Sequence, residues 1–174
     1  IDIGRAGEKY FVNGLGIGFD AEVVIETMKI KKLRGFFIYL YSVLKALKNY
    51  KNRLINLDIN GETISRKVLM ISVGNGRCLG GGFYLTPNAK LDDGLFDICI
   101  FRAMNRIEIL TNLPKALKGK HLNLPQVQCL QTGHLIAQAA DGMPIHMDGE
   151  LLSLNSKKIT IEIVPKALNI IHNC

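Results

Sequence analysis

Alternation of apolar and polar residues is the clearest pattern in the chain. In residues 55–59, INLDI, apolar side chains occupy every second position, and Asn60-Gly61 follows directly. A period of two is typical of a strand with one buried face, and Asn-Gly favours a two-residue hairpin turn. The pattern therefore predicts a β-hairpin whose return strand runs to about Val73.

Several other segments predict strands. Residues 95–101, LFDICIF, form a short apolar run, and the C-terminal part contains QVQCLQT, HLIAQAA, PIHMDGELL and KITIEIVP. Turn residues at Asp148-Gly149 and at Asn155-Ser156 punctuate these runs. We therefore expect short strands separated by turns throughout this part of the chain.

Three glycines at alternate positions distinguish the N-terminal region. Residues 10–24, YFVNGLGIGFDAEVV, open as a strand and contain Gly14, Gly16 and Gly18. Glycines so spaced indicate a bulge or a close approach of the backbone to another group. The spacing is not that of a dinucleotide-binding or phosphate loop.

The first of two predicted helices begins at about Gly35. Within residues 35–47 a helical period places Phe36, Leu40, Leu44 and Leu47 on one face, and further apolar residues widen that surface. A helix this apolar either packs in the core, which we favour, or contacts lipid. At this length it is too short to span a bilayer.

The second predicted helix covers residues 105–120, NRIEILTNLPKALKGK. Asn105 is a candidate N-cap, and Gly119 lies near the C-terminal end. Pro114 should kink or divide the helix, because proline removes a backbone hydrogen bond.

These elements predict the fold class. Strands do not alternate with helices, which argues against a doubly wound parallel sheet. The sequence predicts a mainly β protein, a two-layer β-sandwich with two helical insertions, in which residues 1–174 form a single domain. A hydrophobic content of 48% and a mean hydropathy of +0.16 exclude a disordered chain.

The net charge of +7 suggests a polyanionic partner, although a solvated basic surface would give the same charge. The chain has no Trp and lacks the aromatic residues that single-strand binders place among basic ones, so nucleic acid is not expected. Basic residues on both sides of the apolar helix favour an anionic membrane surface instead. They are Lys29, Lys31, Lys32 and Arg34 before it, and Lys45, Lys48, Lys51 and Arg53 after it.

The four cysteines, Cys78, Cys99, Cys129 and Cys174, show no spacing typical of zinc or redox sites. The even number of cysteines permits disulfides, but Cys99 lies in an apolar strand-like run, so we expect it to be buried and reduced, as in a cytoplasmic protein.

Two turns carry adjacent carboxylates that could bind a hard cation or act as a base: DDG, with Asp92 and Asp93, and DGE, with Asp148 and Glu150. Taken singly, each is more typical of ordinary turn chemistry.

Four motifs in this order resemble a known family. They are YFVNGLGIGFDAEV, GNGRCLGGGFYLTPNAKLDDGLFDICIF, MDGELL and ITIEIVPKALNII. Together they cover essentially the whole chain and resemble the C-terminal domain of the diacylglycerol kinase-like lipid kinases, which are related to sphingosine kinases and more distantly to NAD kinases. The resemblance implies an ATP-dependent phosphotransferase that phosphorylates a lipid hydroxyl, such as that of diacylglycerol.

The resemblance also implies roles for individual residues. The family places the second Asp of the DDG turn, here Asp93, on a Mg²⁺ ion. Main-chain oxygens three residues before it and two after it, here Lys90 and Leu95, complete the protein ligands. The Glu of the DGE turn, here Glu150, is implied to be the general base, and we assign Asp148 to the turn alone.

One departure from the family limits these expectations. The glycine-rich GGDGT segment of the family's nucleotide site is absent, so we expect this chain to supply the acceptor side. An N-terminal α/β domain would bind ATP, and these residues alone should have little or no activity. Asp20 and Glu22 could meet a cationic headgroup, although surface or capping roles are more typical of such acids.

We further expect a cytoplasmic, peripherally membrane-associated protein. Apolar residues in 165–171 could favour a homo-oligomer when no other domain covers them. The alternative is a non-catalytic β-sandwich that binds anionic lipid surfaces or a protein partner.

Overall fold

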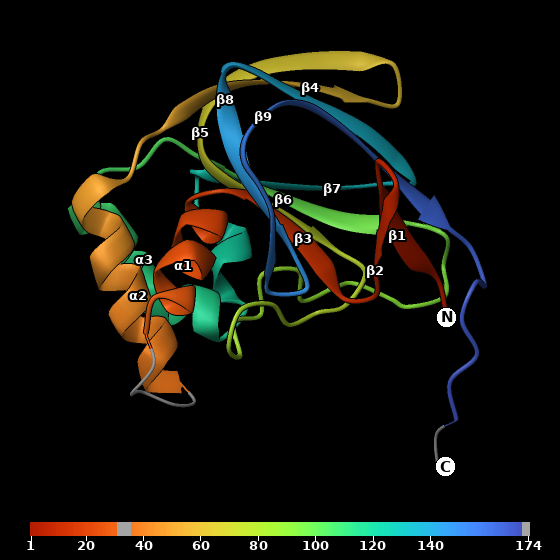
Figure 1. Cartoon of the computed structure of the whole chain (residues 1–174), viewed down its shortest axis with the longest axis horizontal. Coiled ribbons are helices and arrows are strands. Elements are labelled where there is room, and N and C mark those ends of the chain that lie inside the picture. The colour runs from red at the N-terminus through yellow and green to blue at the C-terminus, as the bar shows by residue number, and fades with distance from the viewer. Residues whose placement is uncertain (31–35, 172–174) are drawn as a thin grey trace.

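The computed structural model describes residues 1–30 and 36–171 (Figure 1). Lys31, Lys32, Arg34 and Cys174 lie outside the described residues, as does Gly35, where the first helix was expected to begin. The strands are β1 (Ile3–Ala6), β2 (Lys9–Phe11), β3 (Gly14–Gly18), β4 (Arg53–Ile59), β5 (Glu62–Gly74), β6 (Phe96–Arg102), β7 (Val127–Thr132), β8 (His134–Met147) and β9 (Glu150–Val164). The helices are α1 (Phe19–Met28), α2 (Phe36–Asn49) and α3 (Arg106–Leu117), followed by a 3-10 turn, η1 (Lys120–Asn123).

Two long strands organise the sheet. The antiparallel order is β2-β1-β9-β8-β3-β5-β6-β7, and β4 also pairs with both β5 and β8. Strand β4 pairs with the N-terminal halves of both β5 and β8. Strand β3 pairs with the C-terminal ends of the same two strands. The strands therefore fold over into two layers, which confirms the mainly β, sandwich-like prediction.

The predicted hairpin is β4–β5. Asn60 and Gly61 both have positive φ, 53° and 82°, as a type I′ turn requires. Ile59 pairs with Glu62 across this turn, and Ile55 and Leu57 are buried. The hairpin and the buried face inferred from the sequence are confirmed.

The predicted turn at Asn155-Ser156 is wrong, because β9 runs straight through it. Likewise β8 is one strand where two were predicted. The irregularity lies instead in the pairing, which shifts register near Met143, opposite Ser156. Gly142 permits this shift, since a Cβ there would lie 1.7 Å from Asn155 Oδ1. Long pairing between β8 and β9 overrides the local turn propensity.

Helix α1 was not predicted. No element was assigned from the sequence directly after Gly18, which has a φ of 85° and turns the chain out of β3 into the helix. Acidic Asp20 and Glu22 then occupy the first helical turn, where they favour the positive end of the helix dipole.

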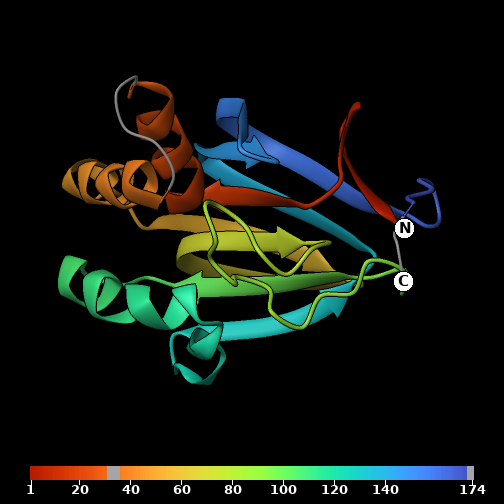
Figure 2. The ribbon, with the colours of Figure 1, turned by 90° about the horizontal axis from the view of Figure 1, so that it is seen from below.

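The α3 prediction is confirmed in its position and cap. Asn105 accepts a hydrogen bond from Glu108 N, and Glu108 accepts one from Asn105 N, which forms a capping box. Pro114 lies inside the helix without dividing it. Figure 2 shows α2 and α3 projecting past the same end of the sheet.

The buried face of α2 differs from the predicted one. Leu47 is buried as predicted, but Leu44 is 50% exposed, and Tyr39, Val43 and Ala46 are buried as well. A helix that is apolar on nearly all sides gives no signal for which stripe faces inward. These residues pack in a second apolar cluster between the helices and the sheet, apart from the core between the layers.

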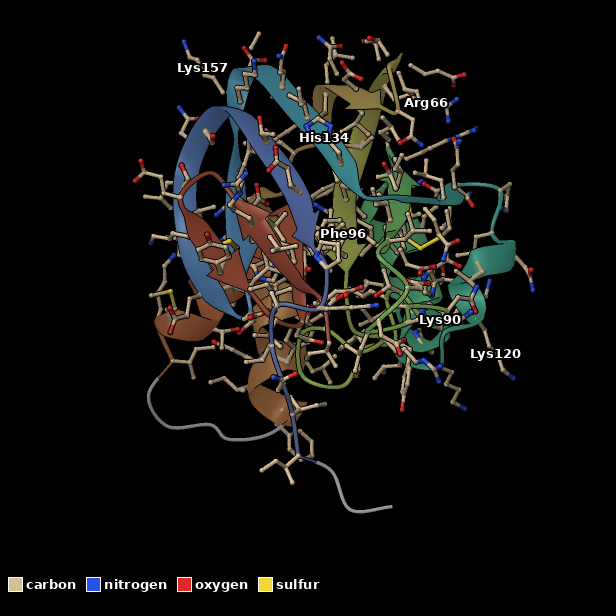
Figure 3. The ribbon with its side chains drawn as sticks, turned by 90° about the vertical axis from the view of Figure 1, so that its right-hand side faces the viewer. Arg66, Lys90, Phe96, Lys120, His134 and Lys157 are labelled. Carbon is tan, nitrogen blue, oxygen red and sulfur yellow. A yellow bond between two sulfur atoms is a disulfide. The ribbon has the colours of Figure 1, made fainter. Side chains whose placement is uncertain are left out.

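Cys99 is buried as predicted, but it is not reduced. It forms a disulfide with Cys129, and the two residues are directly paired between β6 and β7, with a Cα–Cα distance of 4.3 Å (Figure 3). The prediction failed because the facing register of two strands 30 residues apart cannot be read from cysteine spacing.

Candidate functional site

The DGE turn connects β8 to β9 and is held by its first residue. Asp148 has a φ of 47° and Gly149 a φ of 86°. The Asp148 carboxylate accepts three backbone hydrogen bonds, from Val12 N at 2.7 Å, Asn13 N at 3.0 Å and Gly14 N at 2.8 Å. Asp148 therefore does more than form the turn, because it fixes the turn to the corner between β2 and β3.

Glu150 begins β9 at the open side of this turn. Its side chain is exposed and makes no hydrogen bond or ion pair with any residue in 1–30 or 36–171. It lines a surface hollow of about 310 Å³ together with Lys9, Tyr10 and Leu152. A carboxylate that is held on a rigid turn, exposed and unpaired, is free to accept a proton from a bound ligand.

A buried acid that the sequence did not single out holds the DDG turn. Asp2 is 1% exposed and accepts hydrogen bonds from Gly94 N at 2.7 Å and Lys166 N at 2.8 Å. Its own N–H donates to Leu91 O at 2.6 Å. Asp2 thus ties the turn to both the first and the last segments of the domain.

Negative charge is concentrated at the DDG turn. Asp93 is exposed, and one of its oxygens accepts a hydrogen bond from Leu95 N at 3.2 Å. Burial, and to a smaller extent the charge of Asp93, raise the pKa of the nearby Asp97. The described residues contain no cluster of three His, Cys, Asp or Glu side chains suited to a metal.

A metal at the DDG turn would therefore need main-chain oxygens as further ligands. The exposed carboxylate of Asp93, in a region of negative charge, fits a hard cation that takes oxygen ligands. Lys90 and Leu95 lie in the same turn segment, and Lys90 is labelled in Figure 3.

Asn75 connects the two turns. Its side-chain nitrogen donates to Asp2 O at 2.9 Å and to Val12 O at 2.8 Å, and its backbone N–H donates to Asn13 O at 2.9 Å. Asp2 holds the DDG turn, and the 12–14 segment holds Asp148. The two candidate turns therefore share one buried hydrogen-bond network.

Asp20 is buried rather than exposed to a headgroup. It accepts a hydrogen bond from Tyr39 Oη at 3.2 Å, and its other oxygen lies 2.9 Å from His146 Nε2. Burial and the Asp20 charge raise the pKa of Tyr39 well above its ordinary value, so the hydroxyl stays protonated as the donor. Gly16 makes room for this group, because a Cβ there would lie 2.3 Å from His146 Nε2.

Glu22 also has a protein partner. Its carboxylate lies 2.7 Å from Arg53 Nη2, and both side chains are largely buried. Burial raises the pKa of Glu22, and Arg53 opposes that shift. Because both acids are already paired, the geometry favours structural roles; their contact with a substrate stays a prediction.

An apolar cavity lies between α2 and α3 against β5 and β6. Tyr39 and Val43 line it from α2, Leu113 from α3, and Phe101 from β6. Asp20, Asn112 and His121 are among its polar lining residues. Its volume is about 60 Å³, smaller than the 300–1,000 Å³ of typical ligand sites, so a long ligand requires the helices to move apart.

His121, which lines this cavity, should make the folding stability of the protein depend on pH. It is 1% exposed, its Nε2 lies 3.1 Å from Leu85 O, and its Nδ1 has no hydrogen-bond partner in the described residues. Burial lowers the pKa of His121 below its ordinary value of 6.5. Below pH 6.5 the unfolded chain takes up a proton that the folded protein does not, so stability should fall as the pH drops.

The measurement is thermal unfolding of the wild type and of His121→Gln between pH 5 and pH 8. We expect the difference in melting temperature between the two proteins to change below about pH 6.5 and to be constant above it. A constant gap across the whole range would mean that His121 does not contribute to the pH dependence.

Comparison with known proteins yields a family match. The model of the YegS C-terminal NAD kinase beta sandwich-like domain matches residues 14–172. A diacylglycerol kinase of Staphylococcus carnosus is 28% identical over 151 residues, which are 86% of this chain and 49% of that protein. A Pseudomonas putida protein named "Probable lipid kinase YegS-like" is 30% identical over 175 residues, 98% of this chain and 55% of its own length.

Solved structures show the same fold. A diacylglycerol kinase structure from Bacillus anthracis aligns with a TM-score of 0.60 at 17% sequence identity, over 95% of this chain and 50% of the other. The chain thus spans about half the length of the relatives it matches.

Proposed function

Because the chain belongs to the family of YegS C-terminal NAD kinase beta sandwich-like domains, we propose that it forms the acceptor side of an ATP-dependent lipid kinase. Relatives named as diacylglycerol and lipid kinases support a kinase of lipids. The observation that carries the proposal is Glu150, an exposed and unpaired carboxylate on a turn that Asp148 fixes with three backbone hydrogen bonds.

Glu150 acts as the general base in this proposal. Its carboxylate takes the proton of the lipid hydroxyl as that oxygen forms a bond to the γ-phosphorus of ATP. The bond between the γ-phosphorus and the bridging oxygen breaks, and ADP leaves. Positioning and charge neutralisation dominate such a loose transition state, so the rigid attachment of the turn matters as much as the base itself. Residues outside this chain bind the nucleotide.

The acceptor in this proposal is a neutral lipid with a free hydroxyl, such as diacylglycerol. A sphingoid amine is disfavoured because Asp20 and Glu22 already have protein partners. The apolar cavity between α2 and α3 is the candidate site for an acyl chain, once the helices separate. The matching test is phosphorylation of a lipid panel by the full-length protein, where exclusive use of a non-lipid acceptor would overturn the proposal.

We propose further that Asp93, with the main-chain oxygens of Lys90 and Leu95, holds a Mg²⁺ ion. When bound, the ion neutralises charge and rigidifies the DDG turn. The residues of this chain supply its ligands and, through Asp2, anchor the turn to the domain.

Soaking crystals with Mn²⁺ should give an anomalous peak at Asp93. The peak should be lost in Asp93→Asn and retained in Asp92→Asn, because only Asp93 is assigned as a ligand. An ordered turn without a peak at high Mn²⁺ concentration, or equal loss in both variants, would contradict the assignment.

Peripheral attachment to the cytoplasmic face of a membrane is part of this proposal, since the acceptor resides in a bilayer. No helix among the described residues has the length and apolar character needed to span a bilayer.

A further inference from the structure

The outward face of α2 is apolar. Phe37 is 70% exposed, Tyr41 42% and Leu44 50%, and they lie at helical spacing on one stripe. The opposite stripe, with Tyr39 and Val43, is buried. Exposed aromatic and aliphatic residues in a continuous row are unusual on the surface of a soluble domain and mark an interaction site.

The outward face of α3 is similar. Ile107 is 74% exposed and Leu110 43%, while Ile109 between them is buried. The two helices meet where Arg106 Nη2 donates to Lys48 O at 2.9 Å. Both helices also line the apolar cavity, so their exposed stripes lie on the outer side of its two walls.

The charge beside these stripes is almost entirely positive. Exposed basic residues on or next to the two helices are Lys45, Lys48, Lys51, Arg106, Lys115, Lys118 and Lys120, and the only acid within α2 or α3 is Glu108. Glu108 is half-buried and is occupied by the capping box. The surface thus combines apolar side chains with unneutralised positive charge.

We propose that the exposed stripes of α2 and α3 form a docking surface for an anionic lipid bilayer. Apolar side chains on a basic helical surface insert at the boundary between headgroups and acyl chains, and lysines attract the anionic headgroups. Docking there places the cavity walls against the acyl layer. The benefit of this orientation rests on the proposed function, because it lets an acyl chain pass from the bilayer directly into the α2–α3 cavity.

The positive charge favours a bilayer over a second copy of the chain. Two such faces brought together would oppose basic residues to basic residues, whereas an anionic headgroup layer neutralises them.

Sedimentation with vesicles of phosphatidylcholine, with and without phosphatidylglycerol, tests this surface in the full-length protein. We expect binding that needs the anionic lipid and weakens with salt. The double variant Leu44→Ser/Ile107→Ser should lower the partition coefficient by at least about tenfold, because two apolar side chains lose their burial in the bilayer. Removing two charges with Lys45→Gln/Lys48→Gln should lower it by roughly 25-fold.

Matched controls lie on β9, which is not part of either exposed stripe. Leu154→Ser removes a side chain that is 65% exposed, and Lys157→Gln removes a lysine that points to solvent in Figure 3. Both should bind vesicles like the wild type. Equal losses in controls and stripe variants, wild-type binding by the stripe variants, or dimerisation through this face would overturn the proposal.

Activity separates this proposal from the proposed function. On a short-chain, monomeric diacylglycerol the stripe variants should retain wild-type turnover, and on vesicles they should lose it in proportion to binding. If the wild type phosphorylates no lipid, the proposed function fails, while vesicle binding still decides the docking surface.

Discussion

Replacing Glu150 with Gln is expected to lower the turnover of the full-length enzyme by about 10²- to 10⁴-fold, the usual cost of removing a general base. Gln keeps the size and hydrogen-bonding capacity of the side chain but cannot take a proton at neutral pH. Because Glu150 is exposed and has no partner among the described residues, the thermal stability of the protein should hardly change. Steady-state kinetics measure the turnover, and thermal unfolding measures the stability.

Asp148→Asn is the matched control, with a different expected outcome. The amide replaces a carboxylate that faces three backbone N–H groups, so stability should fall clearly while some turnover remains. Near-full turnover in Glu150→Gln with none in a folded Asp148→Asn would exchange the two roles. Full activity in both would remove this turn from catalysis.

The second large effect is expected from Asp20→Ala, which should lower the free energy of unfolding by about 3 kcal/mol. Removing the carboxylate leaves the Tyr39 hydroxyl and His146 Nε2 without their buried partner, and unsatisfied buried groups are costly. For a domain of this size the melting temperature should fall by roughly 10 °C.

Asp20→Asn is the control for this group, because the amide oxygen can still accept from Tyr39 and the amide keeps a hydrogen-bonding group beside His146 Nε2. It should cost much less stability than Asp20→Ala. Similar losses in the two variants would show that the charge of Asp20, rather than its hydrogen bonds, stabilises the site.

The sequence predicted elements whose signals are local. Asn60-Gly61 required positive φ at both positions, and Asn105 with Glu108 had the spacing of a capping box. The order of the glycine-rich, DDG and DGE motifs likewise indicated the family whose model matches residues 14–172.

Features that depend on contacts distant in sequence were missed. The disulfide depends on the register of β6 with β7, and the buried stripe of α2 on what packs against it. Alternating Gly14, Gly16 and Gly18 correctly indicated a close approach, but the group that approaches Gly16, His146, lies 130 residues away.

The candidate site shows the same division. The two turns could be located from their motifs, whereas the buried residues that hold and connect them could not. Asp2 and Asn75 are a single acid and a single amide in apolar surroundings, and their role appears only when three separate segments converge on them.

The pairing of β9 with both β1 and β8 has a consequence for how the protein folds. Ile3 lies opposite Val164, so β1, which pairs with β2 on its other side, gains β9 as its second neighbour only after about 160 further residues have been synthesised. Until then β1 and β8 expose unpaired backbone edges, which are prone to associate with other chains. Such non-local pairing slows folding because long loops must close first. We therefore expect a slow final folding step and a nascent chain that needs chaperone protection until β9 emerges from the ribosome.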